Sequence, residues 1–118
     1  MFDDFFTLLE KSRRQVVLTG AGVSTLSGIP DFRSSGGLYS KEFGQMRVED
    51  ILDIDFFKDH PDVFYSWAKD NWYNIDDVKP NIIHETLKKA EDLGYLTEGI
   101  FTQNIDYLHE RAGSRKVY

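Results

Sequence analysis

Residues 16–33 read VVLTGAGVSTLSGIPDFR, and this stretch decides the fold. The run 16–19 is short, apolar and rich in β-branched residues, and it ends at a glycine, which is typical of a buried strand entering a tight turn. Gly20 and Gly22 allow the backbone to turn sharply and to approach a ligand closely. A helix can begin at Val23, and the N–H groups of its first turn attract phosphate. The stretch therefore predicts a strand–turn–helix phosphate cradle.

Two known phosphate motifs can be compared with this cradle. It is closest to the dinucleotide fingerprint G-x-G-x-x-G, although Thr25 stands at the third glycine position. A P-loop is excluded because Gly28 is followed by Ile29 and not by lysine. A glycine turn without any ligand stays open as an alternative.

Polar residues also follow a second apolar run. Residues 28–33 read GIPDFR, and residues 102–106 read TQNID directly after Ile100 and Phe101. Because open α/β folds bind ligands at the carboxyl ends of their parallel strands, both clusters are expected at one edge of a sheet.

Together these motifs resemble the sirtuins, the NAD-dependent protein deacylases. GAGVS, GIPDFR and TQNID, followed by Leu108-His109 and Ala112-Gly113, stand in the order and spacing of that family, over residues 5–118. The resemblance implies an α/β fold: a partial Rossmann-like parallel sheet with flanking helices and an inserted helical module at about 40–78. Residues 1–118 would form a single truncated NAD-binding domain.

The resemblance also implies a site for NAD. Asp106, with the Ile105 backbone, would hold the nicotinamide carboxamide, and Asn104 would orient a water or hydroxyl on the ribose, so that Asn104 and Asp106 are the candidate catalytic residues. Phe32 would cover the ribose face, and residues 34–39 would form a lid. The full set of implied cofactor-binding residues is Gly20, Ala21, Gly22, Ser24, Thr25, Asp31, Phe32, Arg33, Tyr39, Gln103, Asn104, Ile105 and Asp106.

Some parts of the family pattern are absent from the sequence. The general-base histidine and the four zinc cysteines of sirtuins would come after Tyr118, and His109 matches a different family position. We therefore expect the N-terminal half of a deacetylase, inactive alone, whose complete form acts on acyl-lysine proteins. The alternatives are a non-catalytic nucleotide-binding or interaction module and, less favoured, a hydride-transferring dehydrogenase. The ribose-binding acid of a dehydrogenase would fall near Glu42, outside any strand-like context.

Composition narrows the class of protein further. The chain has 118 residues, a net charge of −6 and no cysteine. This size predicts one domain, and the charge disfavours nucleic acid and anionic membranes as partners. Without thiolates or histidines at ligand spacing, no metal site is expected. The acidic N-terminus does not resemble a signal peptide, so a cytoplasmic protein is expected.

The hydrophobic pattern predicts the remaining elements. Parallel strands are expected at 16–19 and 99–102, with a third beginning near Arg115, and helices at 3–13, 24–28, 53–58, 61–73 and 81–93. The phenylalanines of the first helix are expected to cover the sheet, and the aromatics of 47–75 to form a core. His84 and His109 are expected to be hydrogen-bonded structural groups. A short sheet with an unpaired apolar edge predicts a homo-oligomer.

Overall fold

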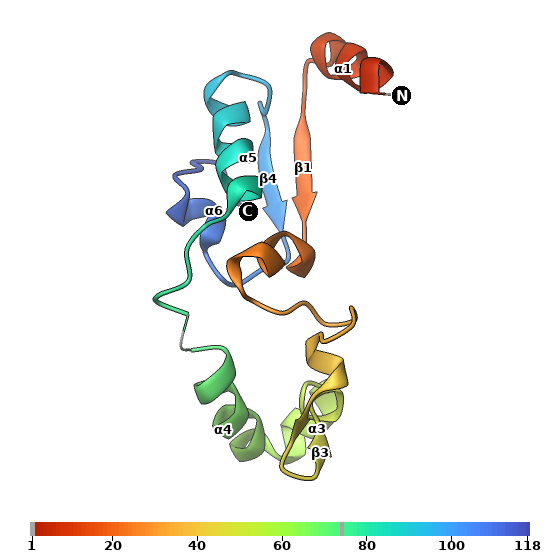
Figure 1. Ribbon diagram of the computed structural model, residues 1–118, viewed down its shortest axis with the longest axis vertical. Coiled ribbons are helices and arrows are strands. Elements are labelled where there is room, and N and C mark those ends of the chain that lie inside the picture. The colour runs from red at the N-terminus through yellow and green to blue at the C-terminus, as the bar shows by residue number, and fades with distance from the viewer. Residues whose placement is uncertain (1, 74) are drawn as a thin grey trace. The chain divides into compact units, whose positions relative to one another are not determined.

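Figure 1 shows the computed structural model, which describes residues 2–73 and 75–118. The chain divides into two compact units: Met1–Ser27 with Lys79–Tyr118, and Gly28–Val78. We call them the sheet unit and the helical unit. The sequence predicts an insert over about 40–78, whereas the compact helical unit already begins at Gly28.

The sheet unit is built around two parallel strands. β1 (Val16–Thr19) pairs with β4 (Gly99–Thr102) in a register that places Val16 beside Gly99 and Thr19 beside Thr102. The fold class and both strands agree with the sequence prediction. Two parallel strands need a crossover connection. Here the connection between β1 and β4 contains the whole helical unit and the helix that follows it in sequence.

A third parallel segment begins where the sequence predicts one. Ile100 forms an isolated parallel bridge with Val117, and the N–H of Ile100 donates to the carbonyl of Lys116 at 2.8 Å. Gly99 permits this approach: its φ is +105°, and a Cβ there would lie 2.5 Å from the Lys116 oxygen.

The crossover helix α5 (Ile82–Asp92) begins as the sequence predicts. The Asn81 side chain accepts from the N–H of Ile83, and the His84 ring in turn accepts from the N–H of Asn81, which forms a capping box. The short helix α6 (Leu108–Arg111), which the sequence does not predict, packs against α5. Leu108 and Ile100 are buried core residues of this unit.

Two expectations for this unit are wrong. The first helix, α1 (Phe2–Lys11), has no buried residue along its described length, and Phe2, Phe5 and Phe6 are each more than half exposed. The spacing of these apolar residues predicts an amphipathic helix, but it does not say which part of the protein packs against the apolar face. Similarly, β1 is buried on one face only, since Val16 and Leu18 are exposed while Thr19 is buried.

The segment after the glycine turn also differs from the prediction. Residues 24–28 were expected to be α-helical, but η1 (Ala21–Ser27) is a 3₁₀ helix. It begins earlier, at the turn itself, where the N–H of Val23 donates to the carbonyl of Gly20. Connecting segments often adopt this tighter winding, although seven residues is longer than most 3₁₀ runs.

The helical unit contains the 3₁₀ helix η2 (Leu38–Ser40) and a small hairpin of β2 (Glu42–Phe43) and β3 (Met46–Arg47). Three helices follow: α2 (Val48–Ile51), α3 (Ile54–Asp59), which Asp53 caps, and α4 (Pro61–Asn71), which begins with proline. The predicted helices 53–58 and 61–73 are thus present.

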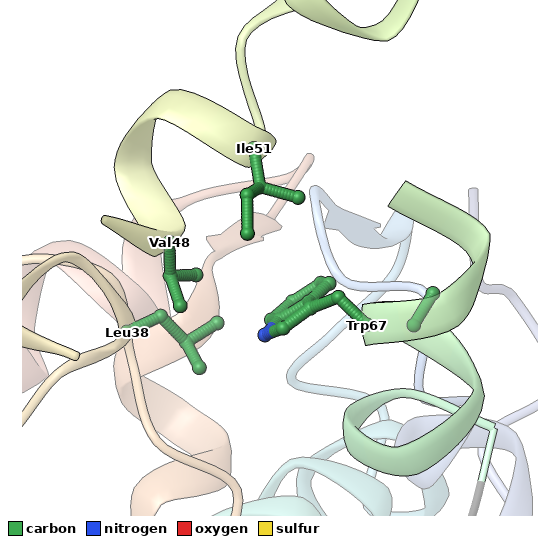
Figure 2. Packing of buried hydrophobic residues seen from close by; sticks show 5 residues of the cluster. Leu38, Val48, Ile51 and Trp67 are labelled. Carbon is green, nitrogen blue, oxygen red and sulfur yellow. The ribbon is translucent and has the colours of Figure 1, made fainter. Parts of the chain in front are cut away.

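A compact apolar cluster holds the helical unit together. Leu38 of η2, Val48 and Ile51 of α2, and Trp67 of α4 converge, as Figure 2 shows, and each is at most 5% exposed. Phe56, Phe64 and Trp72 pack against this cluster, so most of the aromatics form the expected core. Tyr65 and Tyr73 are exceptions, because both are more than half exposed.

Candidate functional site

Within the sheet unit, the glycine turn and the TQNID segment meet at the carboxyl ends of β1 and β4, whereas GIPDFR, the other cluster predicted at this edge, lies in the helical unit. The N–H of Gln103 donates to the carbonyl of Thr19 at 3.1 Å. The side-chain amide nitrogen of Asn104, Nδ2, donates to the carbonyl of Gly20 at 3.0 Å and to Ser24 Oγ at 3.3 Å. The glycine turn and TQNID are therefore joined directly, as expected for an α/β ligand site.

A buried carboxylate lies at the centre of this junction. Ser24 Oγ donates to Asp106 Oδ2 at 2.6 Å, and the N–H of Leu108 donates to Asp106 Oδ1 at 3.0 Å. Ser24 is 1% exposed and Asp106 is 8% exposed. Since an unpaired buried carboxylate is costly, these donors hold Asp106 in one orientation.

The backbone next to Asp106 is in an unusual conformation. Tyr107 has φ +58°, the one described non-glycine residue with positive φ. A non-glycine residue in this region costs about 1–3 kcal/mol, so the surrounding structure must impose it. The turn at Tyr107 lets the carboxylate of Asp106 accept the N–H of Leu108, the first residue of α6.

The glycine turn borders open space. A Cβ placed on Gly20 or on Gly22 would meet no atom of the described chain within 4 Å. Thr25, Gln103 and Ile105 are exposed, Ile105 to 69%. An accessible backbone beside a buried carboxylate and exposed polar side chains is compatible with the chemistry of a nucleotide ligand such as NAD.

The other four implied cofactor residues belong to the helical unit and form a cluster of their own. Asp31 Oδ1 accepts from the N–H of Ser34 at 3.1 Å. The Phe32 and Tyr39 ring centres are 5.5 Å apart, and the Arg33 guanidinium carbon lies 5.3 Å from the Tyr39 ring centre. The loop thus closes on itself through contacts among its own predicted site residues.

Gly37 makes this loop possible. A Cβ at Gly37 would lie 2.8 Å from both Asp31 Oδ1 and the carbonyl oxygen of Phe32. The N–H groups of Leu38 and Tyr39 donate to the carbonyls of Asp31 and Phe32. Any side chain larger than hydrogen at Gly37 would separate these contacts.

Sequence reasoning missed a layer of buried polar residues beneath the site. Thr19 Oγ1 donates to Thr102 Oγ1 at 2.8 Å and lies 3.0 Å from His109 Nε2. His84 and His109 are at most 1% exposed, and both are hydrogen-bonded, as expected of structural histidines. The sequence does show that a threonine ends each strand, Thr19 in β1 and Thr102 in β4. No sequence pattern connects these threonines with His109.

Burial favours the neutral form of both imidazoles. Desolvation lowers the pKa of His84, although the negative charge of Asp106 opposes this. Desolvation and the neighbouring His84 ring lower the pKa of His109, while Asp106 and Glu110 act in the opposite direction.

No group of three histidine or acidic side chains within residues 2–73 and 75–118 is arranged to hold a metal ion. None of the helices in these residues is long and apolar enough to span a membrane.

A parallel strand pair with a glycine turn and a buried carboxylate at its carboxyl end is typical of the Rossmann-like class of α/β proteins, many of which bind nucleotides. The family model described as Sir2 family matches residues 20–118. The chain therefore belongs to the Sir2 family.

Relatives and solved structures agree with this assignment. The chain is 51% identical to an NAD-dependent protein deacetylase of Thermotoga maritima over 97% of the chain and 44% of that protein. It is 42% identical to an NAD-dependent protein deacetylase of Bacillus subtilis, over 98% of the chain and 46% of that protein.

The similar solved structures include ligand complexes. One is a Sir2 complex with p53 peptide and NAD+, with a TM-score of 0.79 and 46% identity over 99% of the chain and 44% of the other. Another is a Sir2 complex with deacetylated p53 peptide and 3'-O-acetyl ADP-ribose. It has a TM-score of 0.84 and 49% identity, and the match covers 98% of this chain and 45% of the other. The chain thus spans just under half the length of the relatives that it matches.

Proposed function

We propose that the chain is the NAD-binding part of an NAD-dependent protein-lysine deacetylase. The observation that supports this best is the buried junction of Asn104, Ser24 and Asp106 beside an open glycine turn. Family membership adds support, since relatives over nearly the whole chain are named NAD-dependent deacetylases. The complete enzyme would remove acyl groups from lysine and give nicotinamide and O-acyl-ADP-ribose.

The residues of the sheet unit have distinct proposed roles. A carboxylate has about four acceptor positions, so Asp106 can receive the carboxamide N–H of nicotinamide while it holds Ser24 and Leu108. Asn104, fixed by Gly20, would orient a ribose hydroxyl or water. Bound NAD supplies a cationic nicotinamide leaving group whose bond to ribose breaks heterolytically.

Further contacts would come from residues with exposed or loop positions. Ala21, Thr25 and Arg33 would bind phosphates and ribose, and Gln103 the ribose next to nicotinamide. Phe32 would shield the reacting ribose from water. The loop of residues 34–39 would order over the bound cofactor as a lid.

Calorimetric titration of the chain with NAD tests this proposal. Asp106→Asn should weaken NAD binding, because the amide adds an N–H donor where a carboxylate acceptor is needed, and Gly22→Ala should weaken it by filling the open turn. Asp59→Asn, an exposed acid at the end of α3, is the matched control. Wild-type affinity in both site variants would contradict the proposed role of the turn and of Asp106.

The chain by itself should not deacylate peptides. His84 and His109 are buried and already hydrogen-bonded, so neither can serve as an accessible base. Loss of a general base costs on the order of 10²–10⁴-fold in rate. Turnover of an acetyl-lysine peptide by the isolated chain with NAD would contradict this expectation.

The isolated chain should also form a homo-oligomer. Val16, Leu18 and Phe101 are exposed apolar residues of the two strands, and such a surface favours pairing with another chain. Light scattering should show an assembly larger than a monomer that Leu18→Lys weakens. A monomeric wild-type chain at micromolar concentration would contradict this prediction. A cytoplasmic location also remains a prediction, to be checked by cell fractionation.

A further inference from the structure

Asn81, the residue that caps α5, also contacts the segment that follows the glycine turn. It lies just after the chain returns from the helical unit at Lys79. Its side-chain nitrogen Nδ2 donates to the carbonyl of Val23 at 2.8 Å and to Ser27 Oγ at 2.8 Å. Both acceptors belong to η1. The proposed reaction assigns no role to Asn81.

The hydrogen bonds of Asn81 define how its amide is oriented. The N–H of Ile83 donates to Asn81 Oδ1 at 2.9 Å, so the oxygen faces the first turn of α5. The nitrogen, which carries two hydrogens, then faces η1, where a carbonyl and a hydroxyl accept them. The opposite orientation would place the amide oxygen against the carbonyl of Val23. One side chain therefore caps α5 through its oxygen and binds η1 through its nitrogen.

Asn104 binds the same segment in the same way, one turn earlier. Its Nδ2 donates to the carbonyl of Gly20 and to Ser24 Oγ, which is four residues further along. The two acceptors of Asn81 have the same spacing, and they are offset from those of Asn104 by three residues. Three residues are one turn of a 3₁₀ helix. The two asparagines thus hold successive turns of η1.

Such support from outside the segment matters because of the winding of η1. Runs of 3₁₀ helix longer than about three or four residues are uncommon, since their hydrogen-bond geometry is poorer than that of an α-helix. Asn81 and Asn104 are both partly buried, so water competes less effectively for their hydrogen bonds than it does at the surface. The conformation of η1 therefore depends on these two side chains as well as on its own backbone.

We propose that Asn81 is a positioning residue of the cofactor site. With Asn104 it holds η1, and through η1 the open glycine turn, in the conformation that receives the ligand. This inference rests on the proposed function, which identifies the ligand as NAD. Asn81 acts through Val23 and Ser27 and is therefore not a catalytic residue.

The contact with Ser27 also joins the two chain connections to the helical unit. Ser27 is the last residue of the sheet unit before that insertion, and Lys79 is the first residue after it. The hydrogen bond from Asn81 to Ser27 connects these two points within the sheet unit. The glycine turn is thus attached to α5 at the place where the chain leaves the sheet unit.

Two variants of Asn81 separate positioning from helix capping. Asn81→Asp keeps an oxygen that caps α5 about as well as asparagine does, but it has no N–H to donate to Val23 and Ser27. Asn81→Ala loses the cap and both donors.

Amide exchange of the whole chain, followed by NMR, measures the two effects at different residues. In Asn81→Asp we expect residues 21–27 to exchange up to about tenfold faster, as loss of one net hydrogen bond predicts, while residues 83–92 keep the wild-type rates. In Asn81→Ala both segments should exchange faster. Wild-type exchange of residues 21–27 in Asn81→Asp, or exchange there as fast as in an unfolded chain before any substitution, would overturn the proposal.

The matched control makes the same chemical change in the other unit. Asn71 Nδ2 donates to the carbonyl of Trp67 at 2.8 Å, so Asn71→Asp also replaces an amide donor by a carboxylate. This variant should leave the exchange of residues 21–27 and the affinity for NAD unchanged. An equal effect of Asn71→Asp on the turn would show that added charge, and not the lost contact, is responsible, and would overturn the assignment to Asn81.

NAD titration distinguishes this inference from the proposed function. If the wild-type chain binds NAD, Asn81→Asp and Asn81→Ala should weaken binding equally, by about three- to tenfold, although only Asn81→Ala loosens α5. Weaker binding in Asn81→Ala alone would reduce Asn81 to a helix cap and overturn the positioning role, as would wild-type affinity in both variants. Failure of the wild-type chain to bind NAD would contradict the proposed function, whereas amide exchange would still decide whether Asn81 holds η1.

Discussion

Replacement of Ser24 by alanine should destabilise the sheet unit more than its small size suggests. The hydroxyl donates to buried Asp106 at 2.6 Å, and Ser24 is itself 1% exposed. A hydrogen bond to a charged group contributes about 1.5–3 kcal/mol, and water cannot replace it fully at a buried site. Ser24→Ala should therefore lower the free energy of unfolding by about 2 kcal/mol.

The choice of assay follows from the positions of the tryptophans. Trp67 and Trp72 both lie in the helical unit, so their fluorescence reports that unit. Amide exchange of residues 16–27 and 99–118 reports the sheet unit. For a unit of this size, about 2 kcal/mol corresponds to a shift in melting temperature of roughly 8–16 °C.

The matched control is the neighbouring hydroxyl. Thr25 is exposed, and its Oγ1 donates to the carbonyl of Gly22 at 3.0 Å. Thr25→Ala should change stability by about 0.5 kcal/mol or less, as most surface substitutions do. If Ser24→Ala and Thr25→Ala cost the same, the buried carboxylate does not depend on Ser24, and the reasoning is refuted.

Three further predictions concern the sheet unit. The pKa values of His84 and His109 are lowered in the folded chain, so the unfolded state binds more protons below about pH 6.5. The free energy of unfolding should therefore fall as the pH decreases, by up to about 2.7 kcal/mol per pH unit for two protons. Urea unfolding between pH 7.5 and 5 measures this slope. Gly99→Ala should destabilise the unit by more than about 1 kcal/mol, since φ is +105° and the new Cβ would lie against Lys116; thermal unfolding measures it. Tyr107→Gly should stabilise the unit by about 1 kcal/mol, because glycine adopts φ +58° without strain and the tyrosine side chain that it removes is exposed. Thermal unfolding measures this change as well.

Controls accompany each of these predictions. His84→Asn should reduce the pH slope by about half, and an unchanged slope would show that carboxylates produce it. Gly22→Ala, whose Cβ meets open space, should leave stability unchanged or slightly raised. A Gly99→Ala variant as stable as Gly22→Ala, or a Tyr107→Gly variant less stable than wild type, would contradict the backbone arguments.

Several local features could be predicted from the sequence because they depend on neighbouring residues. The run 16–19 has β-branched residues before a glycine, and it is β1. Asp53, Pro61 and Asn81 mark helix starts by capping or by ring geometry, and helices begin at each of these places. The motifs 20–24 and 102–106 are specific enough to indicate the family and the sheet edge where they meet.

The sequence by itself determined the two parallel strands, the main helices and the family, and it predicted the residues of the candidate site, but it did not predict the hairpin of β2 and β3. Only the tertiary structure decided which of their atoms meet, because Thr19 and His109 are 90 residues apart, and no local pattern fixes a contact at that separation. The same holds for the exposure of α1: amphipathic spacing shows that a helix has an apolar face, whereas burial depends on what packs against it. The strained turn at Tyr107 likewise follows from the carboxylate and helix on either side of it, and not from any preference of tyrosine.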